Sequence, residues 1–371
     1  MKNIGLLFIA AGIFLSACKQ EKLNDAENGT LLTKNYYKRL EGSIGGDQVI
    51  IQLQKHDSIL FGGYTNQGEE HHLILDSVIG DSLILIDYKL SDREWDHVNA
   101  ARLHLKWVGN GFNGNWNSKK SQETLPVLTK EKYPQGSLKF DIFEYTESLT
   151  AFKNKKDSPK SKFYFYAPTS ENNWINSEFK KAMDSVGTGD WIDIALKQSK
   201  NYLANYVYDA EELIKDYPKM PLAVLNYFNS NQGIIHYNNH GYVVLNRFSD
   251  SYSGGAHGFS FSLLHNYDVK NKKKMKLQDV IRIDSNELGK IITKNYRISR
   301  NIPENEKLEN YLFQNKIMPS KEFYFNDLGL GFLYNPYDIA SYADGQIFIL
   351  IPYKQIRPFL VPDFANRMGL N

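Results

Sequence analysis

Short apolar runs separated by turn residues fill the sequence from Tyr36 to Trp116, and they restrict this part of the chain to a β fold. The runs are rich in Ile, Leu, Val and aromatic residues and comprise residues 47–54, 58–65, 71–79, 82–90 and 101–108. Gly80 and Asp81 lie between two of them, as suits a two-residue hairpin loop. Strands at this spacing predict an all-β meander or small barrel over residues 35–117.

The sequence changes character after this region. Residues 118–136 are polar and contain two prolines, which predicts a linker. Residues 137–361 then alternate aromatic-rich runs with helical patterns, and the aromatic content of 13% suits half-buried strands. Apolar residues from Trp191 to Tyr206 recur at helical spacing, and Pro218 stops the pattern. We expect an α+β domain, with an antiparallel sheet packed against one long and several short helices, and a C-terminal tail at 362–371.

The N-terminal residues resemble a bacterial lipoprotein signal. Lys2 precedes an apolar stretch, Ile4 to Phe14, which is shorter than the roughly 20 residues that span a bilayer. Leu15-Ser16-Ala17-Cys18 is similar to a lipobox, and Cys18 is the single cysteine of the chain. We therefore expect a signal peptide at 1–18, acylation of Cys18 with fatty chains such as palmitate, and a flexible tether at 19–34. The alternative is an ordinary signal peptide with an incidental cysteine.

These features predict a location and exclude some partners. An acylated Cys18 would anchor the chain to a membrane of the cell envelope, the outer membrane in our interpretation, facing the periplasm or the cell surface. A single cysteine forms no internal disulfide. The net charge is +2, from 44 basic and 42 acidic residues, with no long basic block. We therefore expect no nucleic-acid partner.

Two blocks of sequence resemble a bacterial extracytoplasmic domain of unknown function. The first is NRFSDSYSGGAHGFSFSLLHNYDVKNKKKMKLQDVI, residues 246–281, and the second is FYFNDLGLGFLYNPYDIASYADGQIFILIPYKQI, residues 323–356. The domain occurs in the outer part of a lysozyme-sensing anti-sigma factor and in an accessory module of a peptidoglycan deacetylase. The resemblance covers about residues 136–360. It implies a binding module for a protein, such as a lysozyme-like muramidase, or for cell-wall glycan.

The candidate binding residues lie in these two blocks: Tyr252, His257, Tyr334, Tyr337 and Tyr342. The segment SYSGGAHG predicts a turn between two paired strands, with Gly254 or Gly255 at positive φ. His257 would then be held at the edge of the sheet by a backbone or carboxylate hydrogen bond. We expect the two blocks to form one surface. Tyrosines suit a protein interface, but they equally suit the rim of a core.

Other residues suggest chemistry, and each has a simpler interpretation. Asp250, Ser253 and His257 contain the residue types of a catalytic triad, but a triad requires convergence in space. Glu69–His72 has the composition of a metal site, but neighbouring residues of a strand point to opposite faces and cannot both reach one ion. His236 and His240 are four residues apart, but they lie outside a helix and so do not form a helical zinc-binding motif. Asp338 and Asp344 are more simply turn or cap residues than paired acids. We assign no catalytic residue, metal or cofactor. The rival functions are an envelope hydrolase and a structural scaffold.

Overall fold

The computed structural model describes residues 34–89, 98–184 and 189–370. The predicted signal peptide, Cys18 and nearly all of the predicted tether lie outside the described residues. Within those ranges, none of the helices combines the length and the apolar character that crossing a membrane requires.

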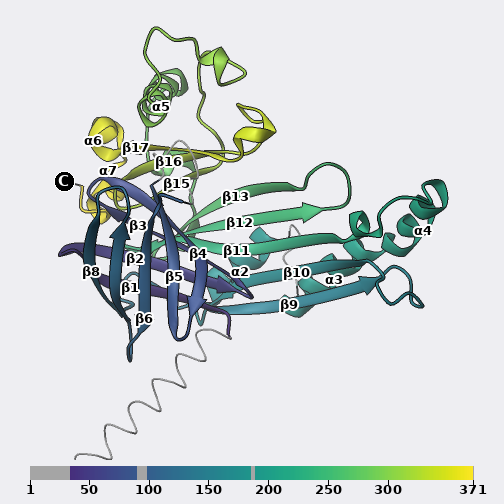
Figure 1. Ribbon diagram of the computed structural model, residues 1–371. Helices are drawn as coiled ribbons and strands as arrows, with labels where there is room; N and C mark the ends of the chain where they lie inside the picture. The colour runs from purple at the N-terminus through teal and green to yellow at the C-terminus, as the bar shows by residue number, and fades with distance from the viewer. Residues whose placement is uncertain (1–33, 90–97, 185–188, 371) are drawn as a thin grey trace, which may run out of the picture.

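The N-terminal part is a closed barrel of eight antiparallel strands (Figure 1). The strands are β1 (Tyr36–Ile44), β2 (Asp47–His56), β3 (Ile59–Asn66), β4 (Glu69–Ile79), β5 (Ser82–Lys89), β6 (Ala101–Trp107), β7 (Phe112–Ser118) and β8 (Glu123–Glu131). Each strand pairs with the next, and β8 returns to pair with β1. The expected meander or small barrel is confirmed. Its interior is a packed core, since side chains such as Leu53, Leu73, Leu85 and Leu103 are fully buried within it.

The predicted linker at 118–136 is wrong, because it contains the strand that closes the barrel. In β8, Val127 and Thr129 point inward and are buried, while Leu128 and Lys130 are exposed. This period of two is masked by the polar composition and by Pro126, which lacks an N–H. The Pro126 carbonyl nevertheless accepts a hydrogen bond from the Gly45 N–H, at 2.9 Å.

The second part is built on a six-stranded sheet of order β14-β13-β12-β11-β10-β9. Its strands are β9 (Asp141–Thr150), β10 (Lys160–Thr169), β11 (Tyr227–Asn239), β12 (Tyr242–Tyr252), β13 (Phe259–Asp268) and β14 (Lys273–Lys274). All neighbours are antiparallel except β10 and β11, which are parallel. A parallel pair needs a long crossover, and the helical segment between these two strands supplies it.

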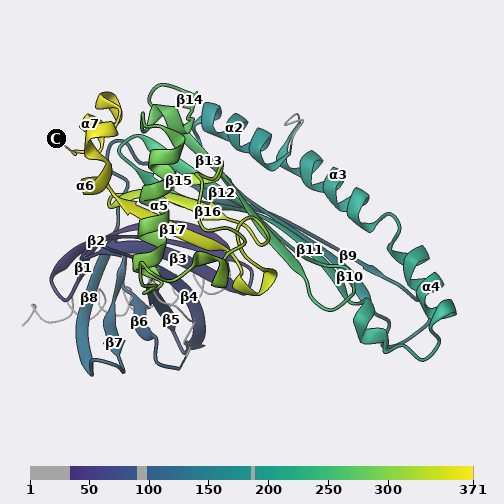
Figure 2. The same cartoon turned by 90° about the horizontal axis from the view of Figure 1, so that it is seen from above.

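Three helices form this crossover: α2 (Asn173–Met183), α3 (Trp191–Leu203) and α4 (Tyr206–Asp216). Figure 2 shows α2 and α3 lying along one face of the sheet, with α4 at the end remote from the barrel. The helical region predicted as one element is interrupted at Ala204 and Asn205, and it ends before Pro218 as expected. The α3 face that carries Trp191, Ile194 and Ala195 packs into the core beneath the helices.

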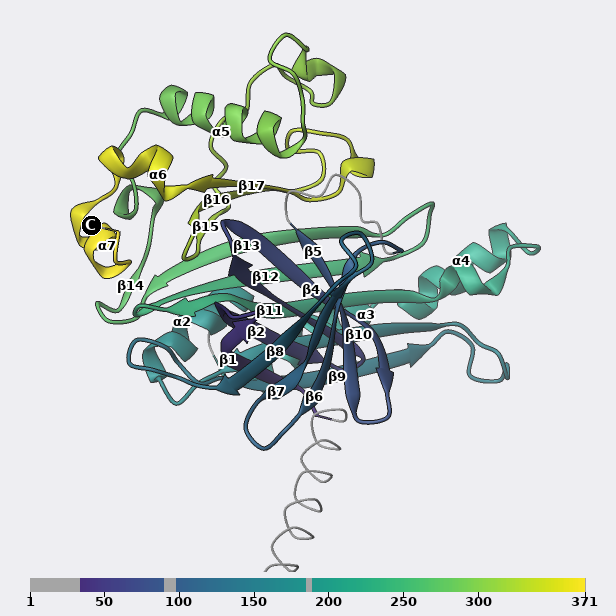
Figure 3. The ribbon, with the colours of Figure 1, turned by 60° about the vertical axis from the view of Figure 1, so that its left-hand side comes forward.

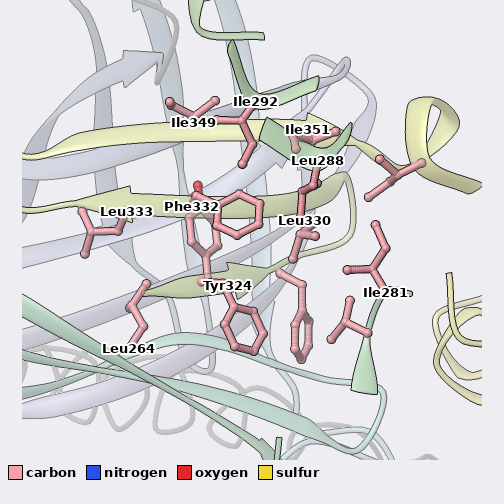
Figure 4. Packing of buried hydrophobic residues seen from close by; sticks show 14 of the residues in the cluster. Leu264, Ile281, Leu288, Ile292, Tyr324, Leu330, Phe332, Leu333, Ile349 and Ile351 are labelled. Carbon is pink, nitrogen blue, oxygen red and sulfur yellow. The ribbon is translucent and has the colours of Figure 1, made fainter. Parts of the chain in front are cut away.

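A smaller layer covers the opposite face of the sheet (Figure 3). It contains β15 (Phe323–Phe325), β16 (Gly329–Tyr334) and β17 (Ile347–Pro352), covered in turn by α5 (Ser285–Ser299). Figure 4 shows the largest core between these layers, where Leu288 and Ile292 of α5 meet Ile349 and Ile351. The α+β class, with a C-terminal sheet and several helices, is confirmed.

The C-terminal tail expected at 362–371 is also wrong. After α6 (Tyr353–Ile356), residues Pro362–Arg367 form α7. Phe364 of α7 is buried in the largest core. The Arg367 guanidinium forms an ion pair with Asp268, at 2.8 Å, and lies 3.9 Å from the centre of the Tyr242 ring. These contacts attach α7 to the sheet.

Buried polar contacts join the barrel to the six-stranded sheet and to the smaller layer that contains β15, and we call these contacts the junction. Arg39 of β1 is fully buried and donates to the Asn238 carbonyl, at 3.0 Å. The Gln54 amide donates to the Gly233 carbonyl, at 2.8 Å. The Glu70 carboxylate accepts hydrogen bonds from Tyr324, at 2.9 Å, and from the Asn326 side chain, at 3.0 Å. Since buried groups on each part satisfy groups on the other, the two parts form one packed unit.

Candidate functional site

The segment from Ser253 to Gly258 is the hairpin loop between β12 and β13, as predicted. Gly254 has φ of 91° and Gly255 has φ of 87°, so both adopt the left-handed conformation that the sequence indicated for one of them. The Tyr252 hydroxyl donates to the Gly255 carbonyl across the loop, at 3.1 Å. Glycine therefore shapes this loop, and the side chains after it project from a defined backbone.

His257 joins the first sequence block to the second. Its ring stacks on Tyr342, with the ring centres 3.8 Å apart and the planes 22° from parallel. The Nδ1–H of His257 donates to the Gly258 carbonyl, at 2.9 Å, because a carbonyl can only accept. The Tyr342 hydroxyl donates to the same oxygen, at 2.6 Å. Residues about 85 positions apart in the sequence thus share one hydrogen-bond acceptor.

The second block also covers the outer edge of β13. Strand β14 pairs only with Tyr267 and Asp268 of β13, so the rest of this edge has no strand partner among the described residues. The Asn335 side chain pairs with the backbone of Ser262, accepting from its N–H at 2.8 Å and donating to its carbonyl at 3.0 Å. The Glu322 carboxylate accepts the N–H of Leu264. Side chains therefore satisfy an edge that would otherwise pair with another chain.

Tyr337 lies at the tip of the turn that follows β16. It has φ of 74°, although it is not glycine, and its side chain is 56% exposed. The Asp338 carboxylate accepts the N–H of Asn335, at 2.8 Å, and the N–H of Tyr337 donates to the Ala340 carbonyl, at 3.1 Å. The Tyr337 ring centre lies 6.0 Å from that of Tyr342. A bulky residue at positive φ is strained, and such strain is concentrated at functional sites.

A pocket of about 510 Å³ lies on the other side of this turn. Its apolar wall includes Leu312, Phe313, Met318 and Ile339, and its charged residues are Lys316, Lys321, Glu322 and Asp338. Phe313 is 57% exposed at the rim, and its N–H donates to the Ile339 carbonyl, at 2.9 Å. We call Phe313, Tyr337, Tyr342 and His257, together with this pocket, the aromatic surface.

The five predicted site residues separate into three groups. His257, Tyr337 and Tyr342 converge on the aromatic surface, as the two-block hypothesis required. Tyr334 is only 3% exposed, lines the pocket and donates to the Met318 carbonyl, at 2.7 Å. Burial raises the pKa of Tyr334 well above its usual range, so this residue is part of the core. Tyr252 points elsewhere, with its ring centre 6.3 Å from that of Tyr227.

Sequence reasoning did not identify Phe313 or the pocket. Phe313 lies between the two sequence blocks, 246–281 and 323–356, in a segment whose hydrophobic residues follow neither strand nor helix periodicity. The one available signal was the sequence NYLFQ, where Tyr311, Leu312 and Phe313 form an apolar run among polar residues. Its two aromatic residues remain exposed while Leu312 is buried.

The triad composition of the first block does not correspond to contacts in the structure. The Nδ1 of His257 bonds to the Gly258 carbonyl and its ring stacks on Tyr342. Asp250 is half-buried in β12, where burial raises its pKa. Ser253 lines a different pocket.

The histidines of Glu69–His72 belong to two separate contacts. His71 pairs with Asp87 inside the barrel, at 2.8 Å. His72 and His236 both lie near the Glu70 carboxylate, at 3.3 Å and 3.4 Å. His71 and His72 thus face opposite sides of β4, as the strand geometry predicts. Over the parts of the chain that the structure describes, no group of three or more His, Cys, Asp or Glu side chains is arranged to hold a metal ion.

Asp338 and Asp344 lie in turns, which is the simpler of the two interpretations of these residues. Asp338 accepts the N–H of Asn335 in a tight turn and does not cap a helix there. Asp344 ends a short 3₁₀ helix, Tyr342–Asp344, and accepts a hydrogen bond from Ser341, at 2.6 Å. Gly345 follows at φ of 64° and leads into β17. Both carboxylates are therefore committed to local backbone geometry.

Comparison with known proteins places the second block and part of the first within a family. Residues 270–354 match a model described as "Protein of unknown function (DUF3298)". No curated protein matches the chain.

Two solved structures of this family resemble the chain. A DUF3298 family member from Bacteroides fragilis NCTC 9343 is 24% identical, with a TM-score of 0.55, and the match covers 63% of this chain and 98% of that one. A DUF3298 family protein from Pseudomonas aeruginosa PAO1 is 15% identical, with a TM-score of 0.43 and coverage of 62% and 98%. The first likeness shows a shared fold. Residues 270–354, which contribute the pocket, Tyr337 and Tyr342 to the aromatic surface, form a DUF3298 domain.

Proposed function

We propose that this chain is a lipid-anchored protein of the bacterial cell envelope that binds a protein partner through the aromatic surface. The observation that carries the proposal is Tyr337, a strained and exposed tyrosine that a hydrogen-bonded turn holds beside a stacked His–Tyr pair. Within the described residues, six other non-glycine residues also have positive φ, but Tyr337 has the largest side chain of the seven.

The chemistry of the aromatic surface suits protein recognition. Tyrosines offer a large apolar face with a polar tip and lose little conformational freedom on binding, so they are frequent among the residues that dominate interface energies. The adjacent pocket offers an apolar cavity for one partner side chain, with Lys316, Lys321, Glu322 and Asp338 around it. Because the turn and the stack are already hydrogen-bonded, binding requires little further ordering.

The partner class follows from the sequence resemblance. The two blocks resemble the outer part of a lysozyme-sensing anti-sigma factor, and both blocks contribute to the aromatic surface. We therefore propose a lysozyme-like muramidase as the partner. A glycan strand of the cell wall is the competing ligand, and the binding experiment includes it.

The binding test uses the full chain purified in detergent, a lysozyme as the first ligand and isolated peptidoglycan as the second. Saturable binding of lysozyme is expected, and Tyr337→Ala weakens it about tenfold or more, as is usual for a central interface tyrosine. Tyr208→Ala removes a tyrosine of similar exposure from α4 and serves as the matched control. Binding to peptidoglycan alone, or equal losses for both variants, would reject a protein partner at this surface.

The membrane anchor has its own test. Cys18→Ala removes the proposed acylation site and is expected to release the chain from membranes while leaving its fold intact. Cell fractionation and metabolic labelling with palmitate measure the two effects. A variant that still labels and sediments with membranes contradicts the anchor without affecting the binding proposal.

A further inference from the structure

A second pocket lies where α4 meets the six-stranded sheet. Figure 1 shows α4 at the end of the sheet remote from the barrel. The volume of the pocket is about 540 Å³. Ser253 of the β12–β13 loop lines this pocket, whereas His257 of the same loop contacts Tyr342 of the aromatic surface. The loop therefore separates two different recesses, and the second has no role in the function proposed above.

One wall of this pocket is acidic. Asp209, Glu212 and Asp216 of α4 all line it, at spacings of three and four residues that place them on one helix face. Glu212 lies 3.6 Å from Lys215, and both side chains are exposed. Among the residues that the structure describes, the carboxylates of Asp209 and Asp216 have no ion-pair partner. The wall therefore has a net negative charge that neighbouring residues do not neutralise.

The pocket lining also includes aromatic rings, from the start of α4 and from β11. Tyr206 and Tyr227 contact each other edge to face, with ring centres 5.5 Å apart. The Tyr206 hydroxyl is already committed to the Leu225 carbonyl, at 2.9 Å. Burial raises the pKa of Tyr206 to about 12, and burial and then the Asp209 charge raise the pKa of Tyr227. The rings therefore stay neutral, and a neutral tyrosine face attracts a cation.

The pocket also has hydroxyl groups that the protein leaves without partners. Ser161 is 1% exposed, lines the pocket and has no hydrogen-bond partner for its Oγ within the described residues. The buried hydroxyl of Tyr202 also lacks a partner at standard hydrogen-bond geometry. Burial raises the pKa of Tyr202, and the neighbouring hydroxyls of Ser161 and Ser253 offset part of that rise. A buried polar group left unpaired is costly, so its presence in a pocket indicates a ligand that supplies the missing bond.

We propose that this pocket binds an organic cation, a primary amine or guanidinium of the kind carried by lysine and arginine side chains. Such groups have N–H donors and no acceptor, which matches a site built of carboxylates, hydroxyl oxygens and tyrosine faces. An anion would be repelled by α4. A neutral apolar side chain would leave Ser161 and Tyr202 unpaired.

The test titrates the full chain, purified in detergent, with three small probes observed by saturation-transfer NMR. Nα-acetyl-lysine amide and Nα-acetyl-arginine amide carry the charge, and Nα-acetyl-norleucine amide is the uncharged analogue of similar shape. Both charged probes are expected to bind, and norleucine to bind at least about tenfold more weakly, since hydrogen bonds to charged groups contribute the difference.

Three variants locate the site. The double variant Asp209→Asn, Glu212→Gln is expected to bind the charged probes about tenfold more weakly than the wild type. Glu211→Gln is the matched control, because Glu211 is exposed on the same helix and does not line the pocket. Ser161→Ala is expected to weaken binding without lowering the thermal unfolding midpoint, because it removes a group with no bond to lose.

Three results overturn the proposal. The first is binding of Nα-acetyl-norleucine amide with the same affinity as the charged probes, which would show that the pocket recognises an apolar side chain and not a positive charge. The second is an equal loss in Glu211→Gln, which makes the attraction a property of the whole helix. The third is the absence of saturable binding of either charged probe below about 20 mM, a concentration that corresponds to negligible affinity. None of these results affects the aromatic surface, which the muramidase experiment tests separately.

Discussion

Tyr337 shows at the residue scale how a local cost in stability can indicate function. A left-handed φ costs a non-glycine residue about 1–2 kcal/mol, and the turn around Tyr337 has to supply that energy. Glycine would accept the same φ without strain, but it would also lose the ring that faces solvent. Stability and binding therefore favour different residues at this position.

This conflict predicts that two substitutions of Tyr337 have the same effect on binding but different effects on stability. Both Tyr337→Gly and Tyr337→Ala remove the ring and should weaken partner binding equally. Tyr337→Gly relieves the backbone strain, whereas Tyr337→Ala keeps it, so the glycine variant should be the more stable by about 1 kcal/mol. Chemical denaturation measures the difference. An alanine variant as stable as the glycine variant would show that the turn is not strained.

His257 gives a second prediction at this scale. The ring is exposed and its stack on Tyr342 is a surface contact, so His257→Ala should cost no more than about 1 kcal/mol of the free energy of unfolding. It should weaken partner binding, because the ring forms part of the aromatic surface. Thermal unfolding and binding measurements separate the two effects. A large fall in the unfolding midpoint with unchanged affinity would make His257 a purely structural residue.

The site residues divide clearly into those that the sequence predicted and those that it did not. The glycines at 254 and 255 were predictable, because positive φ in a tight hairpin is a local requirement. Tyr334 and Tyr337, three residues apart in the same block, were indistinguishable by type. The strand direction of β16 buries the first, and the turn after it exposes the second. Phe313 could not be predicted, because its position depends on the conformation of a loop, and the loop sequence has no periodic hydrophobic pattern.

At the scale of elements, the strands were predictable where alternation was strong and lost where it was weak. Strands β2 to β6 follow the five apolar runs, whereas β8 combines polar residues with Pro126 and was interpreted as a linker. The helical pattern after Trp191 was correct, but it gave no sign that the helix is interrupted at Asn205. α7 was missed because six residues are too few for a periodic pattern.

Glu70 at the junction between the barrel and the sheet gives the element-scale prediction. Burial opposes ionisation of Glu70, but hydrogen bonds from His236 and His72 outweigh it and hold the pKa well below its usual range. The ionised Glu70 carboxylate therefore contributes its full stabilisation of the folded state above the pKa of an unfolded glutamate, roughly 4.3. This contribution is lost as the pH falls towards the lower pKa of Glu70 in the folded state. Glu70→Gln should cost about 3 kcal/mol at neutral pH, because it removes the charge and replaces one acceptor oxygen with an NH2 group, which leaves the donors facing that oxygen unpaired.

Thermal unfolding between pH 7 and pH 3 measures this effect. The thermal unfolding midpoint of the wild type should decrease as the pH is lowered below about 4.5. The difference in unfolding midpoint between the wild type and Glu70→Gln should become smaller as the wild-type carboxylate is protonated. Glu171→Gln, which changes an exposed glutamate, should follow the wild-type curve. A constant difference at all pH values would show that the charge of Glu70 does not stabilise the junction.

At the scale of the whole molecule, the structure predicts one cooperative unit rather than two domains on a linker. Strand β8 is hydrogen-bonded on both sides, and Arg39, Gln54 and Glu70 bond across the junction. Limited proteolysis should therefore spare residues 123–131, and the barrel and sheet should unfold in a single transition. Early cleavage within β8 that yields two stable fragments would contradict a single cooperative unit and would support the interpretation of residues 118–136 as a linker.

The central claim is that three segments distant in sequence form one surface for a protein partner. Hydrogen–deuterium exchange of the full chain, with and without bound lysozyme, tests it most directly. The claim predicts slower exchange on binding in residues 253–262, 311–322 and 335–345, while exchange in the barrel strands stays unchanged. Protection confined to the barrel, or to only one of the three segments, would contradict it.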